Sequence, residues 1–139
     1  MVFGTFDYLH PGHIHFFKQA RALAKNPFLI VSVAREKNTE RIKGVSPENT
    51  EVDRVELLTQ CRLVDRAVLG AKINFFTHIL EQEPVIIALG YDQTAYVNEL
   101  MAFLKKSANT IKVIRLEAYK ERVHKTSLKK RTNKGGMLN

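Results

Sequence analysis

The sequence predicts an α/β fold in a single domain. The chain has 139 residues, 45% apolar and 26% charged, which is the size and composition of one globular domain. Apolar, β-rich runs at 28–34, 64–69, 85–89 and 111–116 alternate with stretches of helical spacing. These runs are continuously apolar, which favours parallel strands covered by helices on both faces. With a short first strand at residues 1–3, the prediction is a doubly wound, Rossmann-like parallel sheet of five strands.

Helices are expected between the strands, because apolar residues recur there every three or four positions. The clearest case places Ile14, Phe17 and Ala20 on one face, and Asn49 or Thr50 is a candidate cap for the next helix. The charged stretch 35–48 is expected to be a long loop of the kind that is usually functional or mobile. The predicted helices cover residues 12–25, 49–62, 73–82 and 95–107.

Cysteine content, hydropathy and charge limit the cellular locations and binding partners that are expected for this chain. Cys61 is the only cysteine, so no intrachain disulfide can form and a reducing, cytoplasmic location is expected. No apolar run reaches the roughly 18 residues of a membrane span, so no membrane contact is expected. The net charge of +8 is concentrated in residues 120–139, where seven Lys or Arg face one acid. This end is either a solvated charge run or a segment that binds phosphates or nucleic acid. It has no aromatic residue for base stacking, which disfavours nucleic acid.

The most informative segment is GTFDYLHPGH, residues 4–13, at the predicted passage from the first strand to the first helix. Ligands bind at this edge of open parallel sheets, and the free N–H groups of a helix N-terminus favour an anion such as phosphate. His10 and His13 are three positions apart, so both rings can face that anion and stabilise charge on a phosphoryl oxygen. Simple capping by the histidines, or a metal site that includes Asp7 and His15, are the alternatives.

The pattern Gly-x-Phe-Asp-x-x-His-x-Gly-His in this segment resembles the signature of the HxGH nucleotidyltransferases, in the cytidylyltransferase-like superfamily. These enzymes join a nucleotide to a phosphate-bearing acceptor and release pyrophosphate. The resemblance runs from Val2 to Leu128 and implies a nucleotidyltransferase domain at 1–128, followed by a frayed basic tail at 129–139. The catalytic residues that it implies are His10, His13 and Lys43. The nucleotide-binding residues implied in this segment are Gly4, Thr5, Phe6, His10, Pro11, Gly12 and His13.

The segment Gly90-Tyr91-Asp92-Gln93 follows the predicted fourth strand. Gly90 allows a base to lie against the backbone, and Asp92 can accept hydrogen bonds from ribose or base. Together with Tyr119, which would lie beside the nucleotide or be a surface aromatic, this segment resembles the archaeal-type FAD synthases most closely.

Four other residues fit the resemblance. Thr126 and Ser127 match a Ser/Thr pair that opens a helix and contacts the outer phosphates, although ordinary capping explains them equally simply. Lys43 matches a lysine that reaches the triphosphate from its loop, with a solvated lysine as the alternative. Arg54 matches a position where the family has an arginine. It is expected either to orient the loop or the phosphates, or to lie on a helix surface.

The function implied is nucleotidyl transfer by in-line attack, from ATP to FMN to give FAD. The alternative is a cytidylyltransferase that uses CTP and a polyol phosphate such as glycerol 3-phosphate, but the chain lacks the Arg-Thr-x-Gly-Ile-Ser-Thr-Thr element of that branch. It also departs from the FAD synthases before the Ser/Thr pair, where Arg122-Val123-His124 replaces the cysteines that those enzymes carry. Mg²⁺ or another divalent ion would be held mainly by substrate phosphates, with no metal ligand from the protein. A homodimer is expected, since dimers are common among related enzymes.

Overall fold

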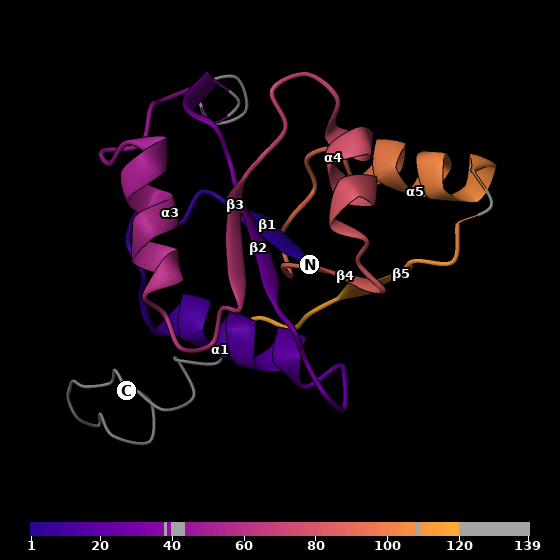
Figure 1. The fold of residues 1–139 in the computed structure, drawn as a ribbon, viewed down its shortest axis with the longest axis horizontal. Helices are drawn as coiled ribbons and strands as arrows, with labels where there is room; N and C mark the ends of the chain where they lie inside the picture. Colours follow the sequence, from indigo (N-terminus) through magenta and orange to yellow (C-terminus); the bar gives the residue numbers. More distant parts are fainter. Residues whose placement is uncertain (38, 40–43, 108, 120–139) are drawn as a thin grey trace.

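The computed structural model describes residues 1–37, 39, 44–107 and 109–119. Strands and helices alternate along these residues and every strand pair is parallel, so the predicted α/β class is confirmed (Figure 1). The elements are β1 (Val2–Gly4), α1 (Pro11–Arg21), β2 (Ile30–Val33), α3 (Glu51–Thr59), β3 (Arg66–Leu69), α4 (Phe75–Gln82), β4 (Ile86–Leu89), α5 (Val97–Lys106) and β5 (Lys112–Arg115).

The strands form two sheets, and the prediction of one continuous five-stranded sheet is wrong. One sheet has the order β1-β2-β3, and β4 pairs with β5 in the other. They meet where the Met1 amino group donates to the Ile86 carbonyl at 2.8 Å and the Ala88 amide donates to the Met1 carbonyl at 3.0 Å. Because β1 is only three residues long and these bonds involve Met1 alone, the pairing does not extend into a ladder.

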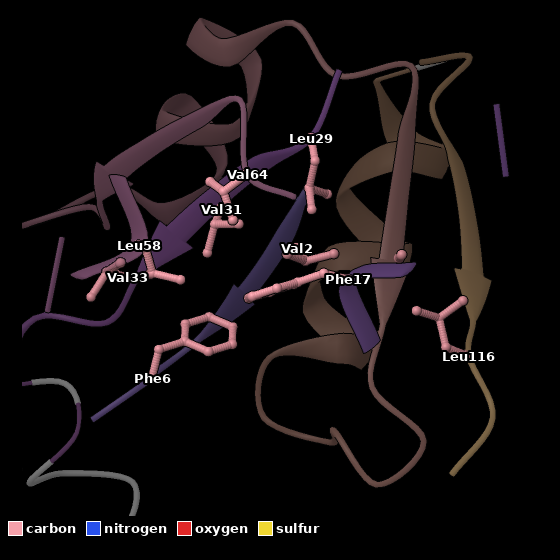
Figure 2. Packing of buried hydrophobic residues seen from close by; sticks show 10 residues of the cluster. Val2, Phe6, Phe17, Leu29, Val31, Val33, Leu58, Val64 and Leu116 are labelled. Atoms are coloured by element: carbon pink, nitrogen blue, oxygen red, sulfur yellow. The ribbon is translucent and has the colours of Figure 1, made fainter. Parts of the chain in front are cut away.

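Helices pack on both faces of the strands. Val31 and Val33 of β2 lie in one apolar cluster with Phe17 of α1 and Leu58 of α3 (Figure 2). Ile30 of the same strand lies in a second cluster with residues of α4, β4 and α5. Burying a side chain as fully as Phe17 or Leu58 stabilises the fold by roughly 1.5–3 kcal/mol. The two clusters therefore fix the strand ends from which the candidate site is built.

The helix boundaries follow local capping. The Thr50 side chain accepts from the Asp53 amide at 3.0 Å and caps α3, and Asn74 caps α4 in the same way. Residues 36, 37 and 39 are helical, so the stretch predicted as loop is partly helical. Among the described residues, no helix has both the length and the apolarity that crossing a membrane requires.

Candidate active site

The segment that carries His10 and His13 and the segment that carries Gly90 and Asp92 follow the carboxyl ends of neighbouring strands. The first leaves β1 and the second leaves β4, and β1 and β4 are joined through the hydrogen bonds of Met1. The strand order runs outward from β1 through β2 to β3, and outward from β4 to β5 on the other side. Ligands bind at such a switch point in open parallel sheets, because the two diverging connections leave a crevice between them.

His10 is the N-cap of α1 and has an extended backbone, with Pro11 as the first helical residue. Its ring nitrogen Nδ1 accepts a hydrogen bond from the Gly12 amide at 3.1 Å. In the neutral ring the proton is therefore on Nε2, which can donate outward. Because the His10 side chain is exposed, that donor is open to a ligand at the start of the helix.

The imidazole rings of His10 and His13 are stacked, with centroids 3.7 Å apart and an angle of 21° between the planes. The buried Phe6 ring packs against His13 in a T-shaped arrangement, with centroids 5.2 Å apart, and so supports the second ring from the protein side. The spacing of three residues thus brings the two rings together, as the sequence predicts. Both lie at the start of α1, where the positive end of the helix dipole favours an anion.

The glycines of this segment are required by side chains of the same segment. A Cβ at Gly4 would lie 2.7 Å from the Phe6 ring, and one at Gly12 would lie 2.9 Å from Cε1 of His10. Phe6 itself is buried and has a φ of 52°, a left-handed conformation that is unusual for a bulky residue. The group that lies closest to the Gly4 Cβ position in the described structure is therefore the Phe6 ring.

Arg54 of α3 is completely buried and does not lie on a helix surface. Its Nη1 donates to the carbonyl of Thr5 at 3.0 Å and to that of Ala34 at 2.7 Å. These carbonyls follow the ends of β1 and β2, so Arg54 joins two connections at the edge of the sheet. The interpretation that it orients the loops is the one that the structure supports.

The Asp7 carboxylate is surrounded by N–H donors. The Glu48 amide lies 2.7 Å from Oδ2, and the backbone amide and the side-chain Nδ2 of Asn49 lie 2.9 and 3.0 Å from Oδ1. Burial alone would raise the pKa of this carboxyl. The hydrogen bonds from Asn49 and Glu48, with the positive charge of Arg54, outweigh burial and hold the pKa of the carboxyl below its ordinary value.

The segment 90–93 forms a tight turn held by Arg115. Nη1 of Arg115 donates to the carbonyls of Gly90 and Gln93, both at 2.8 Å, and the Gly90 amide donates to Oε1 of Gln93 at 3.1 Å. A Cβ at Gly90 would meet nothing closer than 3.9 Å. Unlike Gly4, Gly90 is thus not required by its protein neighbours, because a Cβ there would make only ordinary contacts with the Asp92 and Gln93 side chains. The Asp92 side chain is exposed at this turn.

Tyr119 lies against the start of α1. Its ring is 5.3 Å from that of His15, and its Cβ would be 3.9 Å from a Cβ built on Gly12. Gln19 of α1 holds the chain ahead of it by exchanging two hydrogen bonds with the Glu117 backbone, at 2.8 and 3.0 Å. The structure therefore brings Tyr119 to the same helix end as His10 and His13.

Comparison with known proteins agrees with this geometry. A family model described as cytidylyltransferase-like matches residues 1–132. The chain belongs to the cytidylyltransferase-like family. It is 37% identical over 127 residues to a protein named FAD synthase from Thermoplasma volcanium, with 91% of this chain and 87% of the relative covered. It is 44% identical over 126 residues to one of the same name from Thermococcus sibiricus, with 89% and 84% covered.

A solved structure supports the fold of this cytidylyltransferase-like chain. The protein, described as a lipopolysaccharide core biosynthesis protein from Thermoplasma volcanium GSS1, superposes with a TM-score of 0.76 and 39% sequence identity. The match covers 86% of this chain and 95% of that one. At this similarity the Rossmann-like arrangement of the family applies to the chain, although its strands are divided between two sheets.

Several predicted positions lie outside the described residues of this family member: Lys43, Thr126, Ser127 and the tail 129–139. Two cavities, of about 280 and 450 Å³, lie at the amino ends of the strands and contain none of the predicted site residues. The candidate site described above lies instead at the carboxyl edge, where the residues of the family pattern and the start of α1 are found.

Sequence reasoning missed two features of this domain. Oγ of Ser32 and Nε2 of His78 form a buried hydrogen bond of 2.9 Å on the face covered by α4, and nothing in the spacing of 46 residues signals it. The second feature is the set of hydrogen bonds that Glu48 and Asn49 donate to the Asp7 carboxylate. The Asp7 position was visible in the family pattern, but its partners 41 and 42 residues away were not.

Proposed function

We propose that the protein is an FMN adenylyltransferase, which converts ATP and FMN into FAD and pyrophosphate. The observation that carries this proposal is the stacked pair His10 and His13 at the N-terminus of α1, at the switch point of a cytidylyltransferase-like fold. Relatives named FAD synthase, 37–44% identical over most of the chain, support FMN as the acceptor.

The reaction is a direct displacement. A phosphate oxygen of FMN attacks the α-phosphorus of ATP, a new P–O bond forms, and the bond to the bridging oxygen breaks as pyrophosphate leaves with the electron pair. The FMN phosphate is ionised at neutral pH, so no strong base is needed and catalysis depends on position and charge stabilisation. His10, through Nε2, and His13 are proposed to hold the α- and β-phosphates of ATP and to stabilise the charge that develops on them.

The adenosine is proposed to lie on the turn at 90–93. The missing side chain of Gly90 would let the flat base approach the backbone, Asp92 would accept from the ribose hydroxyls, and Tyr119 would flank the nucleotide from the α1 side. Arg115 keeps the turn in shape through its two carbonyl contacts. Lys43, Thr126 and Ser127 are proposed to reach the outer phosphates.

A divalent ion is proposed to bind at this site together with the substrate phosphates. Among the residues that the structure describes, no group of three His, Cys, Asp or Glu side chains could hold a metal ion. We propose that an ion such as Mg²⁺ would be held mainly by phosphate oxygens and water, where it would supply charge neutralisation. The residues of this chain bind and orient the two substrates around it.

The test is a substrate-pair assay on the full chain. ATP or CTP is combined with FMN or glycerol 3-phosphate in the presence of Mg²⁺, and pyrophosphate release and FAD fluorescence are measured. We expect turnover with ATP and FMN. Turnover only with CTP and glycerol 3-phosphate would reject FAD synthesis in favour of a cytidylyltransferase.

The assembly and location stay predictions. A homodimer should give a light-scattering mass of twice 15.9 kDa, and a monomer mass at assay concentration would contradict it. A cytoplasmic location is inferred from the single cysteine, and fractionation of cells that express the protein tests it.

A further inference from the structure

Asp7 lies in the connection that presents the two histidines, but its carboxylate faces the start of α3. We use the name Asp7 clasp for Asp7, Glu48 and Asn49. The carboxylate accepts three N–H donors at 2.7–3.0 Å, and Nδ2 of Asn49 also donates to the Asp7 carbonyl at 2.8 Å. The Tyr8 hydroxyl adds a bond of 2.6 Å to the Glu48 carboxylate. Two segments more than 40 residues apart are thus bonded side by side.

The hydrogen bonds of the clasp leave the carboxylate little capacity for other chemistry. An ionised carboxylate has about four lone-pair positions, and three of them face N–H groups here. A metal ligand or a general base needs a free lone pair directed at the ion or the proton. The lowered pKa of Asp7 agrees, because these donors stabilise the charged form.

The clasp holds the connection between β1 and α1 next to its strained residue, Phe6. Asp7 directly follows Phe6, whose positive φ is a conformation that a bulky side chain keeps only when its surroundings enforce it. Three residues later, His10 begins α1 and stacks on His13. Arg54, one turn into α3, secures the Thr5 carbonyl on the other side of Phe6. The left-handed residue is therefore held on both sides by the start of α3.

We infer that Asp7 is a positioning residue, which fixes the connection before His10 to the start of α3 and so keeps the stacked imidazoles at the switch point. This inference rests on the proposed function, because the effect of losing the clasp is measured as a change in the rate of adenylyl transfer. A displacement of about 1 Å at a reacting centre can cost roughly a hundredfold in rate. Loss of the clasp should consequently lower kcat, while the adenosine contacts at the 90–93 turn keep the KM for ATP close to its original value.

The experiment compares Asp7→Ala with Asp53→Asn, which removes an exposed carboxylate of α3 for which no side-chain hydrogen bond is found among the described residues. For Asp7→Ala we expect kcat to fall roughly 10- to 100-fold. The KM for ATP and the Mg²⁺ concentration for half-maximal rate should hardly change, and the Glu48 and Asn49 amides should exchange hydrogen faster. Asp53→Asn should match the wild type in all four measurements.

Several results would overturn the inference. One is an unchanged kcat in Asp7→Ala, and another is unchanged exchange at the two amides. A third is a kcat that recovers at high Mg²⁺, which would make Asp7 a metal ligand. If Asp7→Ala does not fold, Asn49→Ala removes only the two side-chain bonds, and it should lower kcat by a smaller factor without altering the Mg²⁺ requirement. If the wild type makes no FAD, the proposed function fails, and amide exchange alone decides the clasp.

Discussion

At the scale of single residues, His10 combines two tasks in one ring. Nδ1 accepts from the Gly12 amide and closes the start of α1, which leaves the opposite nitrogen as the donor that a phosphate meets. A substitution of His10 should therefore have two effects at once, because it removes both the helix cap and the hydrogen-bond donor. The Gly12 Cβ position, 2.9 Å from this ring, is closed for the same reason.

Replacing either histidine by alanine should lower turnover by at least about a hundredfold, the usual cost of removing one preorganised donor to a charged transition state. Steady-state kinetics with ATP, FMN and Mg²⁺ measures this for His10→Ala and His13→Ala. Lys18→Ala, an exposed position of the same helix, serves as the control and should keep wild-type rates. Full activity of either histidine variant would contradict the mechanism.

His78 should make the folded state sensitive to acid. Burial lowers the pKa of His78 below its ordinary value of 6.5, the positive charge of Arg35 lowers it further, and Glu81 opposes both. The unfolded chain therefore takes up a proton at a higher pH than the folded one, so stability is lost as the pH falls below about 6.5. Urea midpoints between pH 8 and 5 should show this decline, and His78→Gln should flatten it. Equal pH slopes for the two proteins would contradict the prediction.

At the scale of elements, Gly4 and Gly90 end neighbouring strands for different reasons. A Cβ at Gly4 would overlap the buried Phe6 ring at 2.7 Å, so Gly4→Ala should cost roughly 1–3 kcal/mol of stability through overpacking. A Cβ at Gly90 meets only ordinary contacts at 3.9 Å. Gly90→Ala should keep the melting temperature and raise the KM for ATP, because the added methyl group takes the space proposed for the base.

Thermal melts and ATP titrations of the two alanine variants separate these effects. A Gly90→Ala protein with wild-type affinity for ATP would show that the base binds elsewhere. A Gly4→Ala protein with an unchanged melting temperature would show that the connection after β1 can rearrange without cost. The two glycines thus test packing and ligand approach separately.

At the scale of the whole molecule, the order of strands and helices could be predicted because it depends on local apolar periodicity. Cooperation between distant segments could not. The break between β1 and β4 depends on how far a three-residue strand extends, which periodicity does not report. Arg54 occupies the kind of helix position that is usually exposed, and only the fold brings the Thr5 and Ala34 carbonyls to it. The family pattern identified His10 and His13, while their support from α3 is visible only in three dimensions.

The contacts of Arg54 also determine the stage of synthesis at which the candidate site can form. Chains emerge from the ribosome amino end first, so the first strand and helix are exposed well before the guanidinium that ties them down has been made. Until then nothing from α3 can secure the backbone around Phe6. The candidate site at the carboxyl edge of the sheet should thus form in the nascent chain only after α3 has emerged, although His10 and His13 are translated much earlier.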